Sequence, residues 1–231
     1  MLQASRRTIN RGPAFIRLLA RLTRVDAPPP PSLSDRLSQW LDWSQALALS
    51  GALDGKPSAE ALDVSGEVGV AQDECARVRV AQVQAVIDAM ACVGDPRQAN
   101  VGVEDVADYT VFSQRYLTRQ RAMQSATGDL RGRLRELLAG QSVDMARLAS
   151  VDAAMELALS PREQALLAVV PDLLENHFEN LRQASLVDAQ ATTTGGTWQN
   201  VFRKDMQSVL LAELDVRFQP VEALLAALRT R

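Results

Sequence analysis

The sequence predicts an all-α fold, an irregular multi-helix bundle of eight to ten helices. Apolar residues recur every three to four positions along most of the chain, which is the period of an amphipathic helix. The 231 residues are 47% hydrophobic and 23% charged, which is enough apolar material for a sizeable core. The segments between the periodic stretches are short, so neighbouring helices are expected to fold back on one another.

Residues 1–31 are predicted to form a basic amphipathic arm and a proline-rich linker, ahead of a helical bundle domain over residues 32–231. After Gly12 and Pro13, apolar residues follow the helical period with arginines on the opposing side, and four prolines at residues 28–31 make a stiff spacer. The favoured interpretation of the arm is a helix packed on its own domain with its arginines in water. The alternatives are contact with a partner or membrane surface, or with nucleic acid.

Charge is distributed unevenly along the chain, because six arginines precede the first acidic residue, Asp26. Removing those six from the 25 basic residues leaves 19 against 28 acidic ones, so the remainder carries a net charge of −9 where the whole chain carries −3. A basic arm on an acidic body is expected to bind phosphates, anionic lipid or an acidic partner. The candidate partner-binding residues are Arg6, Arg7, Arg11, Arg17, Arg21 and Arg24.

The first half of the bundle is predicted to hold three main helices. One is capped by Ser32 or Ser34 and ends near residues 50–51, and a loop with at most one short helix follows over residues 52–70. A second helix covers residues 71–93, where its length outweighs a local strand-like alternation of valines. A third covers residues 104–127 and ends at Gly128.

The second half is divided more finely by its glycines and prolines. Short helices are predicted over residues 130–140 and 143–159, and the sequence Ser160-Pro161-Arg162-Glu163 is typical of a new helix start. Pro171 predicts a kink or break in that helix. A loop at residues 192–196 precedes a helix over residues 198–218, and Pro220 opens a final short one.

Groups with catalytic or metal-binding chemistry are sparse. His177 is flanked by Glu175 and Glu179, but residues two positions away point to other faces of a helix, so we expect a solvated or hydrogen-bonded histidine and hold a functional role as the alternative. Cys75 and Cys92 are expected to be buried thiols in a reducing compartment. We therefore expect no enzymatic activity, no cofactor and no metal.

A second basic cluster lies among the aromatic residues of the third predicted helix and the one after it. Nearby acids, Glu104, Asp105, Asp108, Asp129 and Glu136, are expected to neutralise much of it, which favours solvated helix faces with internal ion pairs. The alternative is a nucleic-acid-binding face, whose affinity would depend steeply on salt. Its candidate residues are Arg115, Arg119, Arg121, Arg131, Arg133 and Arg135.

The longest wholly apolar stretch, residues 165–170, is far shorter than the roughly 20 residues of a membrane-spanning helix, so no transmembrane segment is predicted. Residues 5–10 touch on a twin-arginine export pattern, but Arg17, Arg21 and Arg24 interrupt the apolar region that should follow. A cytoplasmic location is the expectation.

Three stretches carry a family resemblance: LSQWLDWSQALALSGAL at residues 37–53, DYTVFSQRYLTRQRAM at residues 108–123 and LAELDVRFQPVEALLAAL at residues 211–228. Together they resemble an uncharacterised proteobacterial family of small helical proteins, one that is similar to the accessory subunit of type III Zorya anti-phage systems. The resemblance covers nearly the whole chain. It implies a cytosolic component that is recruited to the inner membrane and works with a MotA/MotB-like ion-driven complex and a second accessory protein. It brings no active-site motif. The function expected is a non-enzymatic adaptor, with a nucleic-acid-binding effector as the alternative.

Overall fold

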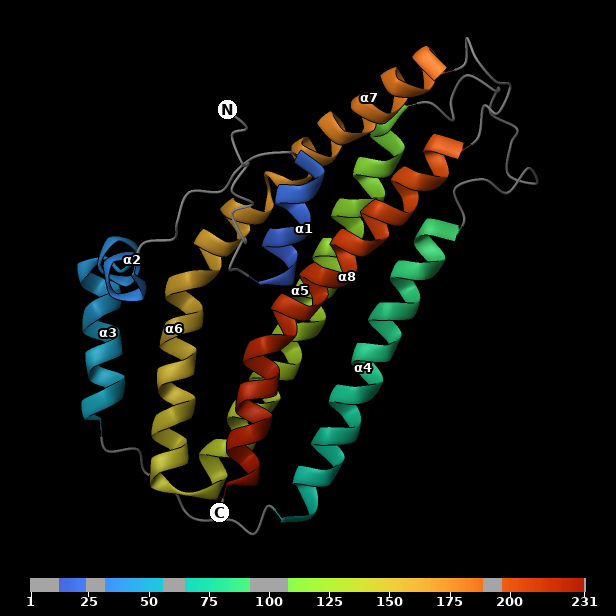
Figure 1. The fold of residues 1–231 in the computed structure, drawn as a ribbon. Coiled ribbons are helices and arrows are strands. Elements are labelled where there is room, and N and C mark those ends of the chain that lie inside the picture. The colour runs from blue at the N-terminus through green and yellow to red at the C-terminus, as the bar shows by residue number, and fades with distance from the viewer. Residues whose placement is uncertain (1–12, 24–31, 56–64, 92–107, 189–196, 231) are drawn as a thin grey trace, which may run out of the picture.

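The computed structural model describes residues 13–23, 32–55, 65–91, 108–188 and 197–230 (Figure 1). These residues form eight α-helices and no strand, so the all-α prediction is confirmed, with the number of described helices at the lower end of the expected range. The helices are α1 (Ala14–Thr23), α2 (Leu33–Trp40), α3 (Trp43–Asp54), α4 (Ser65–Ala91), α5 (Tyr109–Gln141), α6 (Val143–Leu167), α7 (Val170–Asp188) and α8 (Thr197–Arg229).

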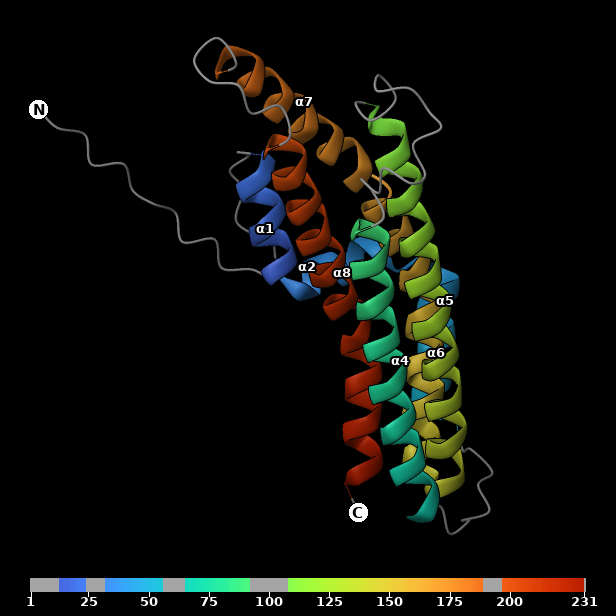
Figure 2. The ribbon, with the colours of Figure 1, turned by 90° about the vertical axis from the view of Figure 1, so that its right-hand side faces the viewer.

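The two longest helices, α5 and α8, run side by side through the centre of an elongated bundle, with α4 along one flank (Figures 1 and 2). Helix α6 packs on α5, and α7 crosses the upper end with α1 resting on α7 and α8. Helices α2 and α3 lie outside α6, away from the centre. Large side chains that are fully buried on α5, α7 and α8 form the core: Phe112, Tyr116, Met123, Leu130, Leu134, Leu138, Leu174, Phe178, Phe202, Met206, Leu210 and Phe218.

An aromatic cluster closes the upper end of the bundle where α5, α7 and α8 meet. Phe178 packs edge to face on Phe202 at 5.0 Å between ring centroids and on Trp198 at 5.0 Å, and Phe112 packs on Phe202 at 5.1 Å. Such tilted and edge-on pairs are preferred because the electropositive ring edge meets the electronegative ring face. These aromatic side chains of α5, α7 and α8 therefore belong to the core or pack against it.

The prediction of one helix from residue 32 to residue 51 is wrong, because the chain divides there into α2 and α3. Asp42 caps α3: its carboxylate accepts the backbone N–H of Gln45 at 2.7 Å, and the Gln45 side chain accepts the N–H of Asp42 at 3.0 Å. This reciprocal capping box starts a new helix at Trp43. Helix α3 continues past Gly51 to Asp54 and α4 begins at Ser65, so both ends of the loop predicted over residues 52–70 are helical.

Helices α5, α6 and α8 correct three further predictions, because each passes through a residue expected to end or begin a helix. Gly128 lies inside α5, Pro161 inside α6 and Pro220 inside α8. At Pro220 the adjoining Phe218 and Val221 are both buried, so core packing continues across the missing backbone hydrogen bond. The predicted interruption at Pro171 is confirmed, since α6 ends at Leu167 and α7 begins at Val170.

None of the helices in the described ranges combines the length and apolar composition required to cross a membrane. The polyproline spacer at residues 28–31, Cys92, Glu104 and Asp105 and the predicted loop at residues 192–196 lie outside the described residues.

Candidate functional site: two arginine surfaces and a buried polar network

Helix α1 is held on the bundle by its apolar side. Phe15 is 5% exposed, and further apolar residues at helical spacing, Leu18, Leu19 and Leu22, pack against the core. Both α7 and α8 contribute to this seat (Figures 1 and 2). The helix therefore packs on its own domain, as favoured from the sequence, and one side of it faces away from the bundle.

The outward side of α1 carries arginines. Arg17 and Arg21 are both exposed, and Arg6, Arg7, Arg11 and Arg24 lie outside the described residues. The helix contains no acidic residue. Because the apolar face anchors α1, its two described guanidinium groups lie at a fixed place on the surface near the upper end of the bundle. This is the arrangement that an acidic partner surface would recognise.

Most arginines of the second cluster bind groups on neighbouring helices of the same molecule. Arg131 and Arg135 on α5 bind Asp152 and Glu156 on α6: the Nη2 atom of Arg131 lies 2.7 Å from Oδ1 of Asp152, and Nη1 of Arg135 lies 3.1 Å from Oδ2 of the same carboxylate. Arg135 also pairs with Glu156. Burial alone lowers the pKa of Arg135, but its hydrogen bonds to Glu156 and Asp152 reverse this, and the pKa is raised overall.

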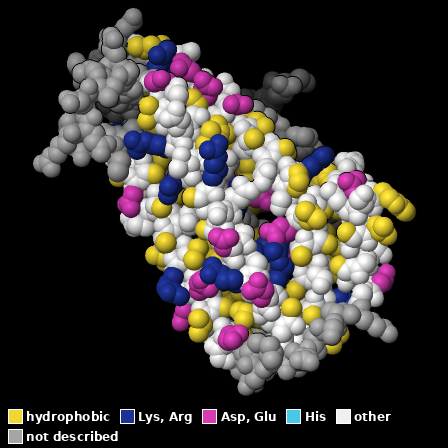
Figure 3. All heavy atoms as spheres, turned by 180° about the vertical axis from the view of Figure 1, so that it is seen from behind, with side chains coloured by type: hydrophobic (Ala, Val, Ile, Leu, Met, Phe, Trp, Pro, Cys, Tyr) yellow, Lys and Arg dark blue, Asp and Glu magenta, His cyan; other side chains and the backbone are white. Residues whose placement is uncertain are grey.

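Two more arginines of this cluster reach α4. Nη1 of Arg133 lies 2.6 Å from Oε1 of Glu74, and Arg115 donates a hydrogen bond to the backbone carbonyl of Ala89 at 2.9 Å. On the face seen from behind, basic side chains lie next to acidic ones (Figure 3). Within the described part of the chain, Arg119 and Arg121 have no ion-pair partner.

Among the described residues, the acids that pair with the cluster are not the ones expected from the sequence. They come from the neighbouring helices α4 and α6, whereas the nearby Asp108 caps α5 by accepting the backbone N–H of Thr110 at 2.9 Å. Hydrogen bonds from Thr110 hold the pKa of Asp108 below its ordinary value. The prediction relied on acids that are close in the sequence, but the charged residues nearest to a helix in space often lie on the helices packed against it.

His177 joins α7 to α8. Its Nε2 atom lies 2.8 Å from Oδ2 of Asp205, the side chain is largely buried, and the ring packs on Phe202 with centroids 6.1 Å apart. This agrees with the hydrogen-bonded histidine expected from the sequence. Among the described residues no group of three or more histidine, cysteine, aspartate or glutamate side chains is arranged to hold a metal ion.

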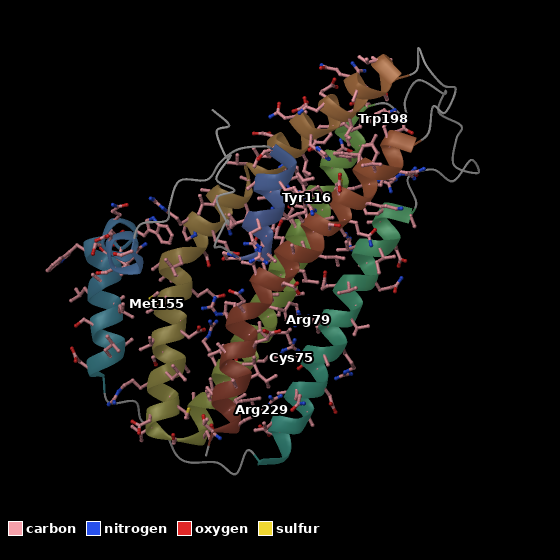
Figure 4. All side chains as sticks on the ribbon, in the orientation of Figure 1. Cys75, Arg79, Tyr116, Met155, Trp198 and Arg229 are labelled. Carbon is pink, nitrogen blue, oxygen red and sulfur yellow. The ribbon has the colours of Figure 1, made fainter. Side chains whose placement is uncertain are left out.

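A buried polar network in the centre of the bundle was missed by sequence reasoning. Tyr116 of α5 lies in the centre of the bundle (Figure 4). Glu213 on α8 is completely buried, and its Oε2 atom accepts hydrogen bonds from the Tyr116 hydroxyl at 2.5 Å and from the Gln120 amide at 3.3 Å. Its Oε1 atom accepts from Nε of Arg217 at 2.9 Å and lies 2.8 Å from Nη2 of the same guanidinium. The network continues to α6, because Nη1 of Arg217 lies 3.1 Å from Oε1 of Glu163.

The network links α5, α6 and α8 and shifts the pKa of the Tyr116 phenol. Burial raises the pKa of Tyr116 strongly, and the adjacent charge of Glu213 raises it further. The signal that could have revealed the network is the phase of α8: Glu213 and Arg217 fall on the same stripe as the buried Leu210, Leu214 and Val221. An ion pair spaced four residues apart on a buried stripe predicts an internal partner helix.

A half-open cavity of about 380 Å³ lies between α4 and α5. Ala71, Cys75, Leu130 and Leu134 provide apolar lining, and the Glu74–Arg133 ion pair borders it. Burial raises the pKa of the Cys75 thiol, with the Glu74 charge adding to the effect. Cys75 is thus buried and protonated in the folded chain, which fits the structural role expected for it.

The protein is an all-α bundle with a polar network at its centre. Helix α1, which carries exposed arginines, packs on the outside of the bundle, and arginines of α5 form ion pairs with neighbouring helices. The DUF3348 family, described as protein of unknown function, matches residues 1–230, and the chain belongs to this family. No curated protein and no solved structure matches the chain. The expectation of membership in an uncharacterised helical family is therefore confirmed.

Proposed function

We propose that the protein is a non-enzymatic adaptor that binds an acidic surface of a protein partner through the arginine side of α1 and the arginines around it. The observation that carries the proposal is the seat of α1: packing of Phe15 and its apolar neighbours fixes the helix, and Arg17 and Arg21 are exposed. A preformed basic surface steers encounter with an acidic partner and fixes its orientation.

The particular partner follows from the resemblance of residues 37–53, 108–123 and 211–228 to the accessory subunit of type III Zorya systems. That resemblance supports a role in anti-phage defence alongside a MotA/MotB-like ion-driven complex in the inner membrane and a second accessory protein. In this proposal the cytosolic part of the membrane complex supplies the acidic surface, and the protein is cytoplasmic and recruited to the inner membrane by that contact.

The second candidate is a nucleic-acid-binding effector, and the observation that favours it is the pair Arg119 and Arg121. These two side chains of α5 have no ion-pair partner within the described residues, whereas four other arginines of the same cluster bind neighbouring helices. Two cations are a small footprint, because each phosphate contact adds separately to affinity and to salt dependence. The adaptor is therefore the stronger proposal.

One experiment with two matched variants separates the two candidates. The arm variant replaces four arginines of the arm by glutamine and leaves Arg17 in place: Arg6, Arg7, Arg11 and Arg21. The body variant removes the same charge from exposed or half-exposed arginines elsewhere: Arg77, Arg119, Arg121 and Arg182. The full chain and each variant are expressed with the neighbouring genes, affinity-purified, and assayed for co-purifying membrane protein and for fluorescence anisotropy of labelled DNA.

The adaptor predicts that the arm variant loses at least tenfold of the co-purifying membrane protein while the body variant retains it. Protection against phage plating should fall with the same variant, and circular dichroism should show equal helicity for all three chains. A body variant that loses steeply salt-dependent DNA binding, with partner recovery unchanged in both variants, would replace the adaptor by the nucleic-acid-binding effector.

A further inference from the structure

Helix α3 carries apolar residues all around its axis and yet buries none of them. Its twelve residues, WSQALALSGALD, include a single charged side chain, Asp54, and none of them is fully buried. Trp43 is 83% exposed and Leu47 is 63% exposed. A helix that is apolar all round is normally covered on all sides. The main contact of α3 within the described residues is α6, which leaves its other side open (Figure 1).

This exposure belongs to a helix with well-defined ends. The Asp42–Gln45 capping box fixes the start, and at the other end the N–H of Gly55 binds the carbonyl of Gly51 at 2.9 Å. Both caps satisfy backbone groups that would otherwise favour unwinding. The apolar side chains of α3 are therefore presented on a stable element.

Large and small side chains are separated along the open side of α3. At 100° per residue, Trp43, Leu47, Ser50 and Asp54 fall within about 60° of one another around the helix. The first two are bulky and the last two are small or polar, and Gly51 adjoins them with open space around its Cα. The half of the open side that carries Trp43 and Leu47 therefore projects, and the half that carries Ser50 and Asp54 is lower.

We infer that the open side of α3 is the interface between two copies of this chain, paired antiparallel about a two-fold axis near the middle of the helix. Such an axis places Trp43 of each copy over Asp54 of the other, and Leu47 over Ser50. The half of α3 with large side chains in each copy then packs against the half with small side chains in the other copy, as an isologous interface requires. The indole N–H of Trp43 faces the partner's carboxylate, a suitable acceptor.

Charge and area favour a second copy as the occupant. The middle of the open side carries no charge, so two identical chains with a net charge of −3 meet there without like-charge contact, and the two copies of Asp54 lie at opposite ends. The bulky side chains of the two copies bury on the order of 1,000 Å² in total, at the low end for a specific interface. An interface at the low end of this range is typical of weak, transient association, so the dimer should form and dissociate as the concentration changes.

Sedimentation velocity of the full chain between about 1 and 100 µM tests this inference. The mass should rise with concentration from 25.2 kDa toward twice that value, and the double variant Trp43→Ser/Leu47→Ser should remain monomeric throughout. The matched control, Leu186→Ser/Val187→Ser, removes two apolar side chains that are comparably exposed at the end of α7, and it should dimerise like the wild type.

The register is tested by charge complementation. Leu47→Lys alone and Ser50→Asp alone place like charges near the axis, and each should weaken the dimer at least tenfold. An equimolar mixture of the two variants should recover a heterodimer, because the introduced lysine of one chain lies opposite the introduced carboxylate of the other. A wild-type chain that stays monomeric at 100 µM, or a dimer that all α3 variants leave unchanged, overturns the inference.

Discussion

The hydroxyl of Tyr116 on α5 donates a hydrogen bond of 2.5 Å to Oε2 of Glu213 on α8, and both side chains are completely shielded from solvent. A buried carboxylate is costly unless donors surround it, and Glu213 has three: the phenol, the Gln120 amide and the Arg217 guanidinium. The contact fixes the relative position of the two longest helices along their axes.

Replacing Tyr116 by Phe should lower the free energy of unfolding by about 1 to 3 kcal/mol. The ring stays in place, but Glu213 loses its shortest hydrogen bond while remaining buried. Tyr109→Phe is the control, because its hydroxyl binds the Pro171 carbonyl at a half-buried site and its loss should cost less. Urea denaturation followed by circular dichroism measures both. Equal stability of Tyr116→Phe and the wild type would show that the buried hydrogen bond contributes nothing.

The fold should lose stability in alkaline solution. The pKa values of both tyrosines are raised above the ordinary 10.0, in each case first by burial, so the folded state holds these protons where the unfolded state releases them. Their contribution is complete below about pH 10 and is lost as pH rises, by up to about 1.4 kcal/mol per pH unit for each group. Unfolding free energies measured from pH 8 to 11 should decline above pH 10, and less steeply in Tyr116→Phe. A flat profile would contradict the burial of both phenols.

Gly128→Ala and Gly132→Ala should each stabilise the protein by about 0.5 to 1 kcal/mol. Both glycines lie inside the continuous helix α5, and a Cβ atom built at either position meets no other atom within 4 Å. Thermal unfolding of the single and double variants measures the effect, and the two gains should add. A loss of stability at Gly128 would mean that α5 is broken there, as the sequence had predicted, and a loss at Gly132 would mean that α5 is not a continuous helix at that position.

Asp152→Ala should destabilise the protein by about 1 to 3 kcal/mol, because it leaves two largely buried guanidinium groups with one acidic partner. Asp144→Ala is the matched control: Asp144 is also an acid of α6 that lies near an arginine, but it is highly exposed, and its loss should change stability by less than about 0.5 kcal/mol. Chemical denaturation of both variants gives the comparison. Similar values for the two would remove the α5–α6 ion pairs as a source of stability.

The sequence predicted the fold class, the helical character of α1 and α4 and the interruption at Pro171, because each rests on the apolar period or on a local backbone rule. It failed where local rules and core packing disagree. Gly128 and Pro220 weaken a helix locally, but Leu130 and Val221 beside them are buried, and the core outweighs the local cost. The opposite error occurred at Asp42, where a short capping box divided a stretch that looked like one helix.

The candidate surfaces divide in a similar way. The apolar seat of α1 follows from its sequence period, which places Phe15 on the side opposite Arg17 and Arg21. The partners of the α5 arginines could not be predicted from the sequence, since Glu74 and Asp152 come from other helices and their positions depend on how the bundle packs. Pairing across helices is a tertiary property, and only the complete arrangement determines which arginines stay available to other molecules.

The central claim, that α1 is seated by its apolar side and binds an acidic partner with its arginines, is tested most directly by the salt dependence of that binding. The affinity of the purified chain for the co-purified membrane complex should be measured by biolayer interferometry at about 50 and 300 mM salt, which lie below and above the roughly 100 mM at which the Debye length is about 10 Å. We predict that salt weakens wild-type binding by tenfold or more and that the arm variant binds weakly at both concentrations. Binding that is equally tight for both chains and indifferent to salt would contradict the claim.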